Sequence, residues 1–156
     1  MSAEARLAEL GITLPAVPAP AGAYVPALVS GSLVFTAGQL PFVSGELPAT
    51  GKVGAGDGLV SADEAKAYAR LSAINALAAA RSVLGSLDRV TRVVKVVGFV
   101  ASDPSFTGQP GVINGASELL GEVFGAEIGA HARSAVGVAV LPLDSPVEVE
   151  LILEFA

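Results

Sequence analysis

The sequence predicts an α+β fold, in which one mixed β-sheet carries two helices packed on one of its faces. Three observations support this prediction. Strand-like and helix-like segments follow one another in the order β-β-α-β-α-β-β. Both long helix-like segments carry one apolar stripe, which a sheet face would cover. The 156 residues contain neither an internal repeat nor a second apolar core, so we expect a single domain over residues 1–156.

Residues 1–15 are expected to form a helical extension ahead of the first strand. Ser2 is a suitable N-cap, the leucines that follow share one helical face, and Gly11 ends the helix. Residues 14–23 contain three prolines, which fix φ and remove backbone donors. We therefore expect an extended arm there, and neither a helix nor a central strand.

Two short strands are expected to form a hairpin after this arm. The apolar segments 24–29 and 33–37 are separated by Ser-Gly-Ser, a sequence typical of a tight turn. Residues 42–60 contain five glycines and one proline, and they predict a long loop before the first long helix.

The clearest helix of the sequence begins at Ser61. Ser61 and Glu64 have the spacing of a capping box, in which each side chain bonds the other residue's backbone amide. Apolar residues then recur at helical spacing through Leu71 and Leu77, and alanine is frequent. Gly85 ends the predicted helix.

The second half of the chain predicts three strands and one helix. Residues 90–101 are rich in β-branched residues and almost continuously apolar, as expected of a strand covered on both faces. A helix is expected over 112–124, and strands over 135–141 and 147–155. In the last strand apolar and acidic residues alternate, which predicts one buried and one open face.

The high share of apolar residues implies more buried apolar surface than one small subunit provides. Hydrophobic residues make up 52% of the chain and charged residues 15%, with a mean hydropathy of +0.64. No apolar run reaches the roughly 18 residues that span a bilayer, so we expect no membrane partner. A homo-oligomer with an apolar interface is the economical expectation. Cysteine is absent, and the first residues do not resemble a signal peptide, so a cytoplasmic location is expected.

The same numbers disfavour several classes of function. The net charge is −6, and nine basic residues are scattered along the chain, so we expect no nucleic-acid partner. A single histidine and no cysteine leave no multi-histidine or thiolate metal site. Dinucleotide and phosphate loops and the Gly-x-Ser-x-Gly elbow are also missing, so neither a metal nor a cofactor is expected.

Arg133 and Glu148 are the candidate functional pair. Arg133 lies in His-Ala-Arg-Ser-Ala-Val-Gly, at the mouth of an apolar strand and among small residues that leave room for a ligand. A guanidinium can bind a carboxylate through two parallel hydrogen bonds. Glu148 begins the next strand, beyond a Leu-Pro corner. A fixed cation and a fixed anion beside an apolar wall suit a small substrate that bears a carboxylate.

Each candidate residue also has a purely structural interpretation. Arg133 is consistent with a solvated arginine at a strand entrance, and Glu148 with a solvent-facing carboxylate of an alternating strand. His131 is consistent with a structural hydrogen bond, Asn114 with a helix cap and Tyr24 with packing. Residue types and spacing leave these alternatives open.

Five short motifs, taken together and in order, resemble those of one known family. From about residue 16 to the C-terminus, the chain resembles the reactive-intermediate deaminase (Rid, or YjgF-like) family, which is also named after the endoribonuclease L-PSP. The His-Ala-Arg-Ser-Ala-Val-Gly segment is similar to that of a longer subgroup. The motifs are Ala21-Gly22-Ala23-Tyr24, Phe35-Thr36-Ala37-Gly38-Gln39, Ala132-Arg133-Ser134, Leu141-Pro142 and Val147-Glu148-Val149-Glu150.

This resemblance implies an assembly and a reaction. It implies a chorismate-mutase-like subunit in a homotrimer, with three sheets forming a central β-barrel, the helices outside and a cleft between each pair of subunits. It also implies hydrolysis of reactive enamines or imines, such as 2-aminoacrylate, to 2-oxo acids and ammonia without a cofactor. The ligand would be a small carboxylate-bearing imine or a 2-oxo acid.

The resemblance also assigns roles to individual residues. Arg133 matches the arginine that holds the substrate carboxylate, and Glu148 matches the carboxylate that positions the attacking water. Tyr24 and Asn114 match residues that line the cleft. Gly38 matches the glycine whose backbone approaches the ligand.

Two further binding residues are expected beside Arg133, and the motifs depart from the family pattern. His131 alternates onto the side of Arg133, and Ala135 stands where relatives commonly have cysteine. The chain has Gly-Ala-Tyr-Val for the usual Gly-Pro-Tyr-Ser, and Thr-Ala-Gly-Gln for Thr-Ser-Gly-Gln.

Three other functions remain open at this point. One is a non-catalytic trimer that binds small carboxylates, and another is a specialised deaminase of aminomuconate-type enamines. The third is an endoribonuclease, which the acidic charge and the single histidine disfavour.

Overall fold

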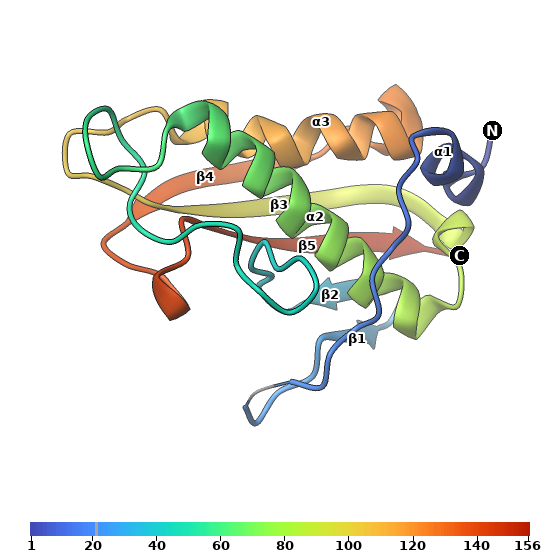
Figure 1. Ribbon diagram of the computed structural model, residues 1–156. Helices are drawn as coiled ribbons and strands as arrows, with labels where there is room; N and C mark the ends of the chain where they lie inside the picture. Colours follow the sequence, from blue (N-terminus) through green and yellow to red (C-terminus); the bar gives the residue numbers. More distant parts are fainter. Residues whose placement is uncertain (21) are drawn as a thin grey trace.

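The computed structural model of the protein describes residues 1–20 and 22–156. Ala21, part of the arm expected over residues 14–23, lies outside these described residues. The described chain forms one five-stranded sheet with helices against it (Figure 1). Two elements, η1 and η2, are short 3₁₀ helices, and the order along the chain is α1 (Ala3–Glu9), β1 (Ala27–Ser30), β2 (Leu33–Thr36), α2 (Ala62–Leu84), η1 (Leu87–Arg89), β3 (Val90–Ala101), α3 (Gln109–Ile128), β4 (Ala132–Val138), η2 (Pro142–Asp144) and β5 (Val147–Phe155).

The sheet is mixed, which confirms the prediction. Its strand order is β1-β2-β5-β3-β4, so β5 lies at the centre, and β1 and β4 are the edges. Strands β3 and β4 are parallel, whereas the other neighbouring pairs are antiparallel. A parallel pair needs a long crossover connection, and α3 supplies it.

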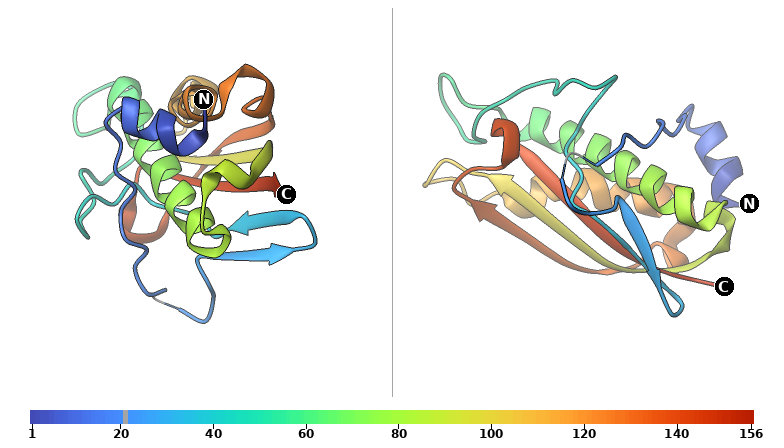
Figure 2. Two further views of the ribbon diagram at one scale, coloured as in Figure 1. Left: turned by 90° about the vertical axis from the view of Figure 1, so that its right-hand side faces the viewer. Right: turned by 90° about the horizontal axis from the view of Figure 1, so that it is seen from below.

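The two long helices cover the same face of the sheet, as predicted (Figure 2). Helix α2 begins with the predicted capping box: Ser61 Oγ accepts from Glu64 N at 3.2 Å, and Glu64 Oε2 accepts from Ser61 N at 3.4 Å. Between helices and sheet lies an apolar core, whose largest fully buried members include Leu77, Ile113, Leu119, Leu120, Val96, Leu151 and Leu153.

Helix α1 forms within the expected N-terminal extension. Ser2 Oγ accepts from Ala5 N at 3.2 Å and caps it. Glu4 then connects α1 to the rest of the fold, because its Oε1 accepts from Leu87 N at 3.0 Å and lies 3.2 Å from Arg81 Nε.

Three predicted segments differ from the structure by three residues or more at one end, and strand pairing explains the two that are strands. The first strand spans Ala27–Ser30 rather than 24–29, because hairpin pairing with β2 begins at residue 27. The second long helix spans Gln109–Ile128 rather than 112–124, with Pro110 in its first turn. The fourth strand spans Ala132–Val138 rather than 135–141, because its parallel register with β3 starts at Ala132. Arg133 therefore lies inside β4 instead of standing before it.

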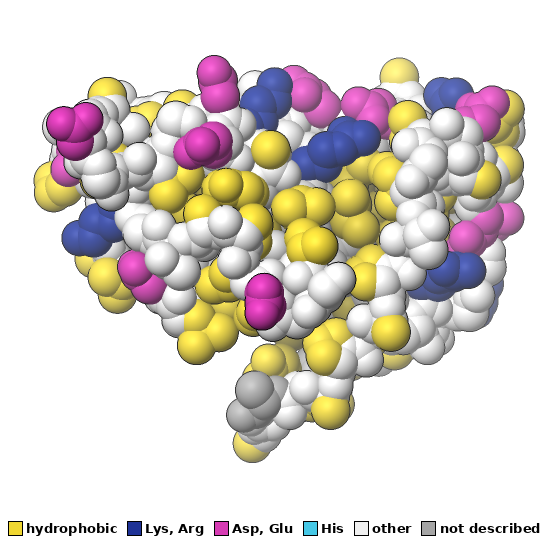
Figure 3. All heavy atoms as spheres, in the orientation of Figure 1, with side chains coloured by type: hydrophobic (Ala, Val, Ile, Leu, Met, Phe, Trp, Pro, Cys, Tyr) yellow, Lys and Arg dark blue, Asp and Glu magenta, His cyan; other side chains and the backbone are white. Residues whose placement is uncertain are grey.

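The opposite face of the sheet has no helix over it in the described part of the chain (Figure 2). It presents large apolar side chains to the surface, among them Leu28, Phe35 and Val136, which are 48%, 36% and 44% exposed. On the helix-bearing face, Lys and Arg side chains lie among Asp and Glu side chains along α2 and α3 (Figure 3). Across residues 1–20 and 22–156, no helix combines the length and apolar character that a bilayer crossing requires.

Candidate functional site

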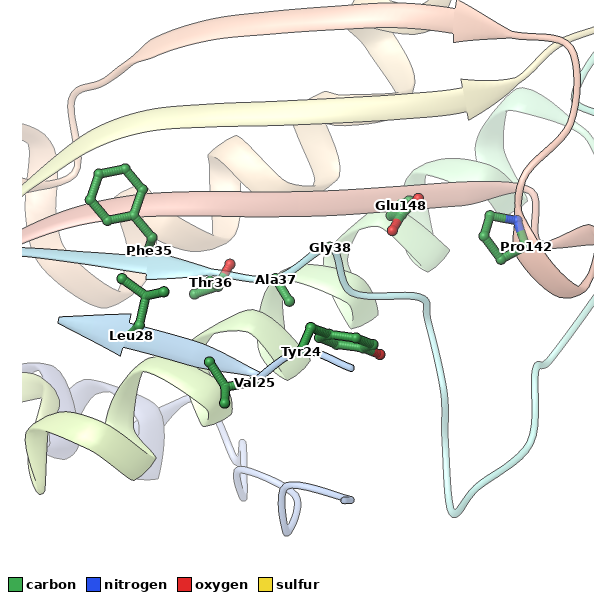
Figure 4. Close-up of a pocket in the computed structure, with 9 residues that line it drawn as sticks. All are labelled: Tyr24, Val25, Leu28, Phe35, Thr36, Ala37, Gly38, Pro142 and Glu148. Carbon is green, nitrogen blue, oxygen red and sulfur yellow. The ribbon is translucent and has the colours of Figure 1, made fainter. Parts of the chain in front are cut away.

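An open hollow of about 470 Å³ lies beside the β1–β2 hairpin, where the central strand β5 begins (Figure 4). Most of its wall is apolar, and a single carboxylate faces it. The lining side chains come from the segment before β1, from β1, β2 and the residues after β2, from η2 and from β5. They are Tyr24, Val25, Leu28, Phe35, Thr36, Ala37, Gly38, Pro142 and Glu148.

Glu148 is the carboxylate in this hollow. Its neighbours Val147 and Val149 are fully buried and point toward the helices, so Glu148 points to the opposite face. On that face it lies across from Phe99 of β3. Glu148 is about half-buried, and this burial, followed by the nearby Glu150 carboxylate, raises its pKa above the usual glutamate value. A raised pKa brings a carboxyl group closer to the range in which it can accept and return a proton near neutral pH.

Gly38 lies directly against the Glu148 side chain. Two backbone hydrogen bonds between Gln39 and Val149, at 2.8 and 3.0 Å, hold the segment after β2 beside β5. A Cβ on Gly38 would lie 2.8 Å from the Glu148 carboxyl carbon and closer still to Oε1. A Cβ there would displace the flexible Glu148 side chain, so the position of the carboxylate depends on glycine at 38. Tyr24, which is 54% exposed, lies at the rim of the same hollow (Figure 4).

Arg133 is placed on the helix-bearing side of the sheet. It lies across from the buried Val96 of β3, and its Nη1 donates to Asn114 Oδ1 at 2.7 Å and to Ser117 Oγ at 3.2 Å. Both partners belong to α3. Ser117 was not among the residues predicted from the sequence, although its spacing carries a signal: residues three apart on a helix share a face, and Asn114 was a candidate.

His131 joins this second group through Ser117. Its Nε2 lies 2.9 Å from Ser117 Oγ, and its Nδ1 lies 2.6 Å from the Gly129 carbonyl oxygen. Ala135, two residues beyond Arg133 on the same strand, lies across from Gly98 and packs against the core.

One chain does not bring Arg133 and Glu148 together. Along β3, the partners of Arg133 and Glu148 are three residues apart, so the two side chains emerge on opposite faces. The two residues are separated by two strand spacings of about 4.8 Å across the sheet and by three residues of about 3.3 Å along the strands. Their backbones are therefore about 14 Å apart. Within one subunit, therefore, the candidate pair does not form one site. The predicted residues fall into two sets: Tyr24, Gly38 and Glu148 at the hollow, and Asn114, His131, Arg133 and Ala135 at β4.

The arrangement of the acidic residues and the histidine also bears on metal binding. Within the described residues, no three His, Cys, Asp or Glu side chains converge in a way that could hold a metal ion.

Residues 4–155 match the model of one protein family, described as "YjgF/chorismate mutase-like, putative endoribonuclease". The match covers nearly the whole chain, including all of α1 except Ala3. The chain is also 47% identical over 150 residues to protein TCP17 of Trypanosoma cruzi, an alignment that covers 96% of this chain and 92% of that protein.

Two solved structures extend the similarity to three dimensions. The protein Atu1372 of Agrobacterium tumefaciens, whose function is unknown, is 44% identical with a TM-score of 0.88, covering 99% of this chain and 94% of that one. TdcF of Escherichia coli, solved with bound serine, is 27% identical with a TM-score of 0.66, covering 92% of this chain and 96% of that one.

Proposed function

The chain belongs to the YjgF/chorismate mutase-like family, to which the Rid proteins belong, and from this premise we propose that it is a hydrolytic deaminase of reactive enamines and imines. The substrates are small, carry a carboxylate next to the imine carbon and resemble 2-aminoacrylate and its imine tautomer. The products are a 2-oxo acid and ammonia. The observation that carries this proposal is a half-buried Glu148 carboxylate, laid against Gly38 in the wall of an apolar hollow.

Glu148 suits the role of the residue that activates water. Desolvation and the charge of Glu150 raise its pKa, which makes it a better proton acceptor than an ordinary surface glutamate. Gly38 and Pro142 border it, so a small planar substrate can approach the carboxylate from the open side of the hollow.

Arg133 suits the role of the carboxylate clamp. Asn114 and Ser117 engage one of its terminal nitrogens, Nη1, and within the described part of the chain no hydrogen bond engages Nη2 or Nε. That free edge has the fork geometry that a carboxylate accepts with both oxygens. TdcF supports a ligand of this chemistry, because the serine bound to that relative carries a carboxylate next to an amine-bearing carbon.

Within one chain the two sets of residues lie apart, on opposite faces of the sheet. We therefore place the active site between subunits of a homotrimer, with Arg133 of one subunit facing the hollow and Glu148 of the next. Exposed apolar residues on the uncovered sheet face, such as Leu28 and Phe35, and on the edge strand β4, such as Val136, support an interface of this kind.

The chemistry needs only orientation and one proton shuttle. Glu148 takes a proton from water as the water oxygen bonds to the imine carbon, and it passes this proton to the imine nitrogen to give an amino alcohol. Glu148 then takes the proton of the hydroxyl and delivers it to the nitrogen as the carbon–nitrogen bond breaks, so that ammonia leaves and the 2-oxo acid forms. Fixing the substrate carboxylate on Arg133 lowers the entropic part of the barrier by several kcal/mol, up to roughly 7–11 in ideal cases.

Substitution of the two catalytic residues tests the proposal. We expect Arg133→Ala to abolish hydrolysis of 2-aminoacrylate generated in the assay, and Glu148→Gln to lower kcat about 10²- to 10⁴-fold with a smaller effect on KM. Sedimentation should show that both variants keep the wild-type oligomeric state. Full activity of Arg133→Ala would contradict the proposal.

The pH profile provides an independent reading of Glu148. Because the acting form is the carboxylate, kcat/KM should fall as pH drops through the pKa of Glu148, and the raised pKa moves this acid limb to higher pH than an ordinary glutamate would give. The limb should vanish from the residual activity of Glu148→Gln.

If the wild-type protein binds 2-oxobutyrate but hydrolyses no imine, a non-catalytic binder replaces the deaminase. Preference for larger enamines would indicate the specialised deaminase.

A further inference from the structure

A continuous chain of hydrogen bonds runs from the Arg133 guanidinium to the backbone at the end of α3. Arg133 Nη1 lies 3.2 Å from Ser117 Oγ, which lies 2.9 Å from His131 Nε2. His131 Nδ1 lies 2.6 Å from the Gly129 carbonyl oxygen. Asn114 Oδ1 accepts from the same Nη1 at 2.7 Å.

With a neutral imidazole, the direction of every hydrogen bond between Arg133 and Gly129 is fixed by its two ends. A carbonyl oxygen can only accept, so Nδ1 of His131 carries a proton and donates it to Gly129. In a neutral imidazole Nε2 is then an acceptor, and Ser117 must turn its hydroxyl proton toward it. The lone pairs of Ser117 Oγ are thereby left for the guanidinium N–H of Arg133. One tautomer of His131 and one orientation of the Ser117 hydroxyl therefore satisfy all of these hydrogen bonds.

The fold brings these residues together through one helix end and one strand. Asn114 and Ser117 lie one turn apart on α3, while His131 and Arg133 are two residues apart and point to the same side of β4. Between them Gly125 has a φ of 82°, a conformation that favours glycine, and its carbonyl accepts from Gly129 N at 2.9 Å. This backbone turn delivers the Gly129 carbonyl to the imidazole.

We propose that Ser117 and His131 are positioning residues that fix the Arg133 guanidinium, so that its Nε–Nη2 edge is presented to the substrate carboxylate. The inference deepens the proposed function and relies on Arg133 being the carboxylate clamp. A long arginine side chain ordered before the ligand arrives loses less rotamer freedom on binding. Removing Ser117 or His131 should therefore weaken carboxylate binding about 2- to 10-fold, while Arg133 itself keeps its charge.

Nuclear magnetic resonance of the imidazole nitrogens tests the hydrogen-bond chain without any ligand. His131 is the single histidine of the sequence, so its signals need no assignment against others. We expect the neutral Nδ1–H tautomer at pH 8, with Nε2 as a hydrogen-bond acceptor, and a shift of the Nε2 signal in Ser117→Ala. An Nε2–H tautomer, or an Nε2 signal that Ser117→Ala leaves unchanged, would overturn the proposal.

Binding and kinetics of matched variants test the consequence for Arg133. We expect Ser117→Ala and His131→Ala to raise KM for the imine and Kd for 2-oxobutyrate about 2- to 10-fold with a smaller change in kcat, and Ser117→Thr, which keeps a hydroxyl, to restore both constants. Ser82→Ala is the control, because that hydroxyl donates within its own helix to Ala79 O. Equal behaviour of Ser117→Ala and Ser117→Thr would contradict the positioning role.

A third measurement separates this inference from the proposed function. The guanidinium signals of Arg133, assigned by their loss in Arg133→Lys, should show slower rotation in wild type than in Ser117→Ala. If the protein binds no 2-oxo acid and hydrolyses no imine, the proposed function fails, whereas the rotation rate and the tautomer still decide whether Ser117 and His131 fix Arg133. Equal rotation rates in wild type and Ser117→Ala would overturn the inference even in an active enzyme.

Discussion

At the scale of single residues, the feature that most shapes the hollow is the absence of a side chain at position 38. The Glu148 carboxylate fills the space that a Cβ on Gly38 would need, and the Gln39–Val149 backbone bonds prevent the two segments from separating. Gly38 has no positive φ, so the requirement for glycine arises from this contact and not from backbone conformation. A methyl group at 38 would push the carboxylate out of its place.

Gly38→Ala should therefore lower kcat about 100-fold, since small displacements of a catalytic group have effects of that size. The measurement is a double-mutant cycle with Glu148→Gln, in steady-state imine hydrolysis. Because the added methyl acts through the carboxylate, Gly38→Ala should cost much less in the Glu148→Gln background. Additive losses would show that Gly38 acts independently of Glu148.

At the scale of elements, the close approach of α2 and α3 builds the face on which Arg133 is held. A Cβ on Gly115 would lie 3.0 Å from the Lys66 carbonyl carbon and closer to its oxygen, so the two helix backbones nearly touch there. Lys66–Glu118 and Arg70–Glu122 ion pairs, at 3.2 and 2.9 Å, join the helices alongside this contact. These pairs are exposed, so each contributes little, and the backbone contact determines the helix spacing.

Gly115→Ala should lower the free energy of unfolding by about 1–3 kcal/mol, because backbone atoms cannot yield as a flexible side chain can. Gly121→Ala is the matched control: it lies in the same helix with nothing within 4 Å of its Cβ position. The control should raise stability by about 0.5–1 kcal/mol through helix propensity. Urea denaturation at one protein concentration measures both, and equal effects would show that the helix crossing tolerates a methyl group.

At the scale of the whole molecule, the fold leaves two incomplete sets of site residues on opposite faces of one sheet. The hollow offers a carboxylate and apolar walls, whereas the outer edge of β4 offers a guanidinium with one free edge. The uncovered sheet face supplies apolar surface for association. A subunit by itself is therefore expected to be inactive, and oligomer formation is expected to create the site.

Mixing two inactive variants tests this expectation. If each site takes Arg133 from one subunit and Glu148 from its neighbour, hybrids of Arg133→Ala and Glu148→Gln subunits contain some sites with both residues intact. Random reassembly of an equal mixture should restore about a quarter of wild-type activity. The measurement is imine hydrolysis after joint refolding, compared with each variant refolded alone. No recovery from well-mixed oligomers would rule out a shared site.

The types and order of the elements could be predicted from the sequence because their signals are local. The Ser61–Glu64 capping box, the alternation through residues 147–155 and the turn at 30–32 each involve neighbouring residues, and the structure confirms all three. The register between β3 and β4 is not local. Because of this register, the fourth strand begins three residues earlier than the sequence predicts. Arg133 therefore lies on the helix-bearing face, where it donates to Ser117.

Glu148 and Glu150 show most clearly what the sequence alone could not determine about the site. Both lie on the same face of β5 with the same alternation, so the sequence determines only that one face of this strand is acidic. Tertiary structure distinguishes the two, because Gly38 packs against Glu148 and Gln39 pairs with the residue next to it. Contacts between segments about a hundred residues apart leave no trace in local periodicity, which is why only the folded chain shows which carboxylate faces the hollow.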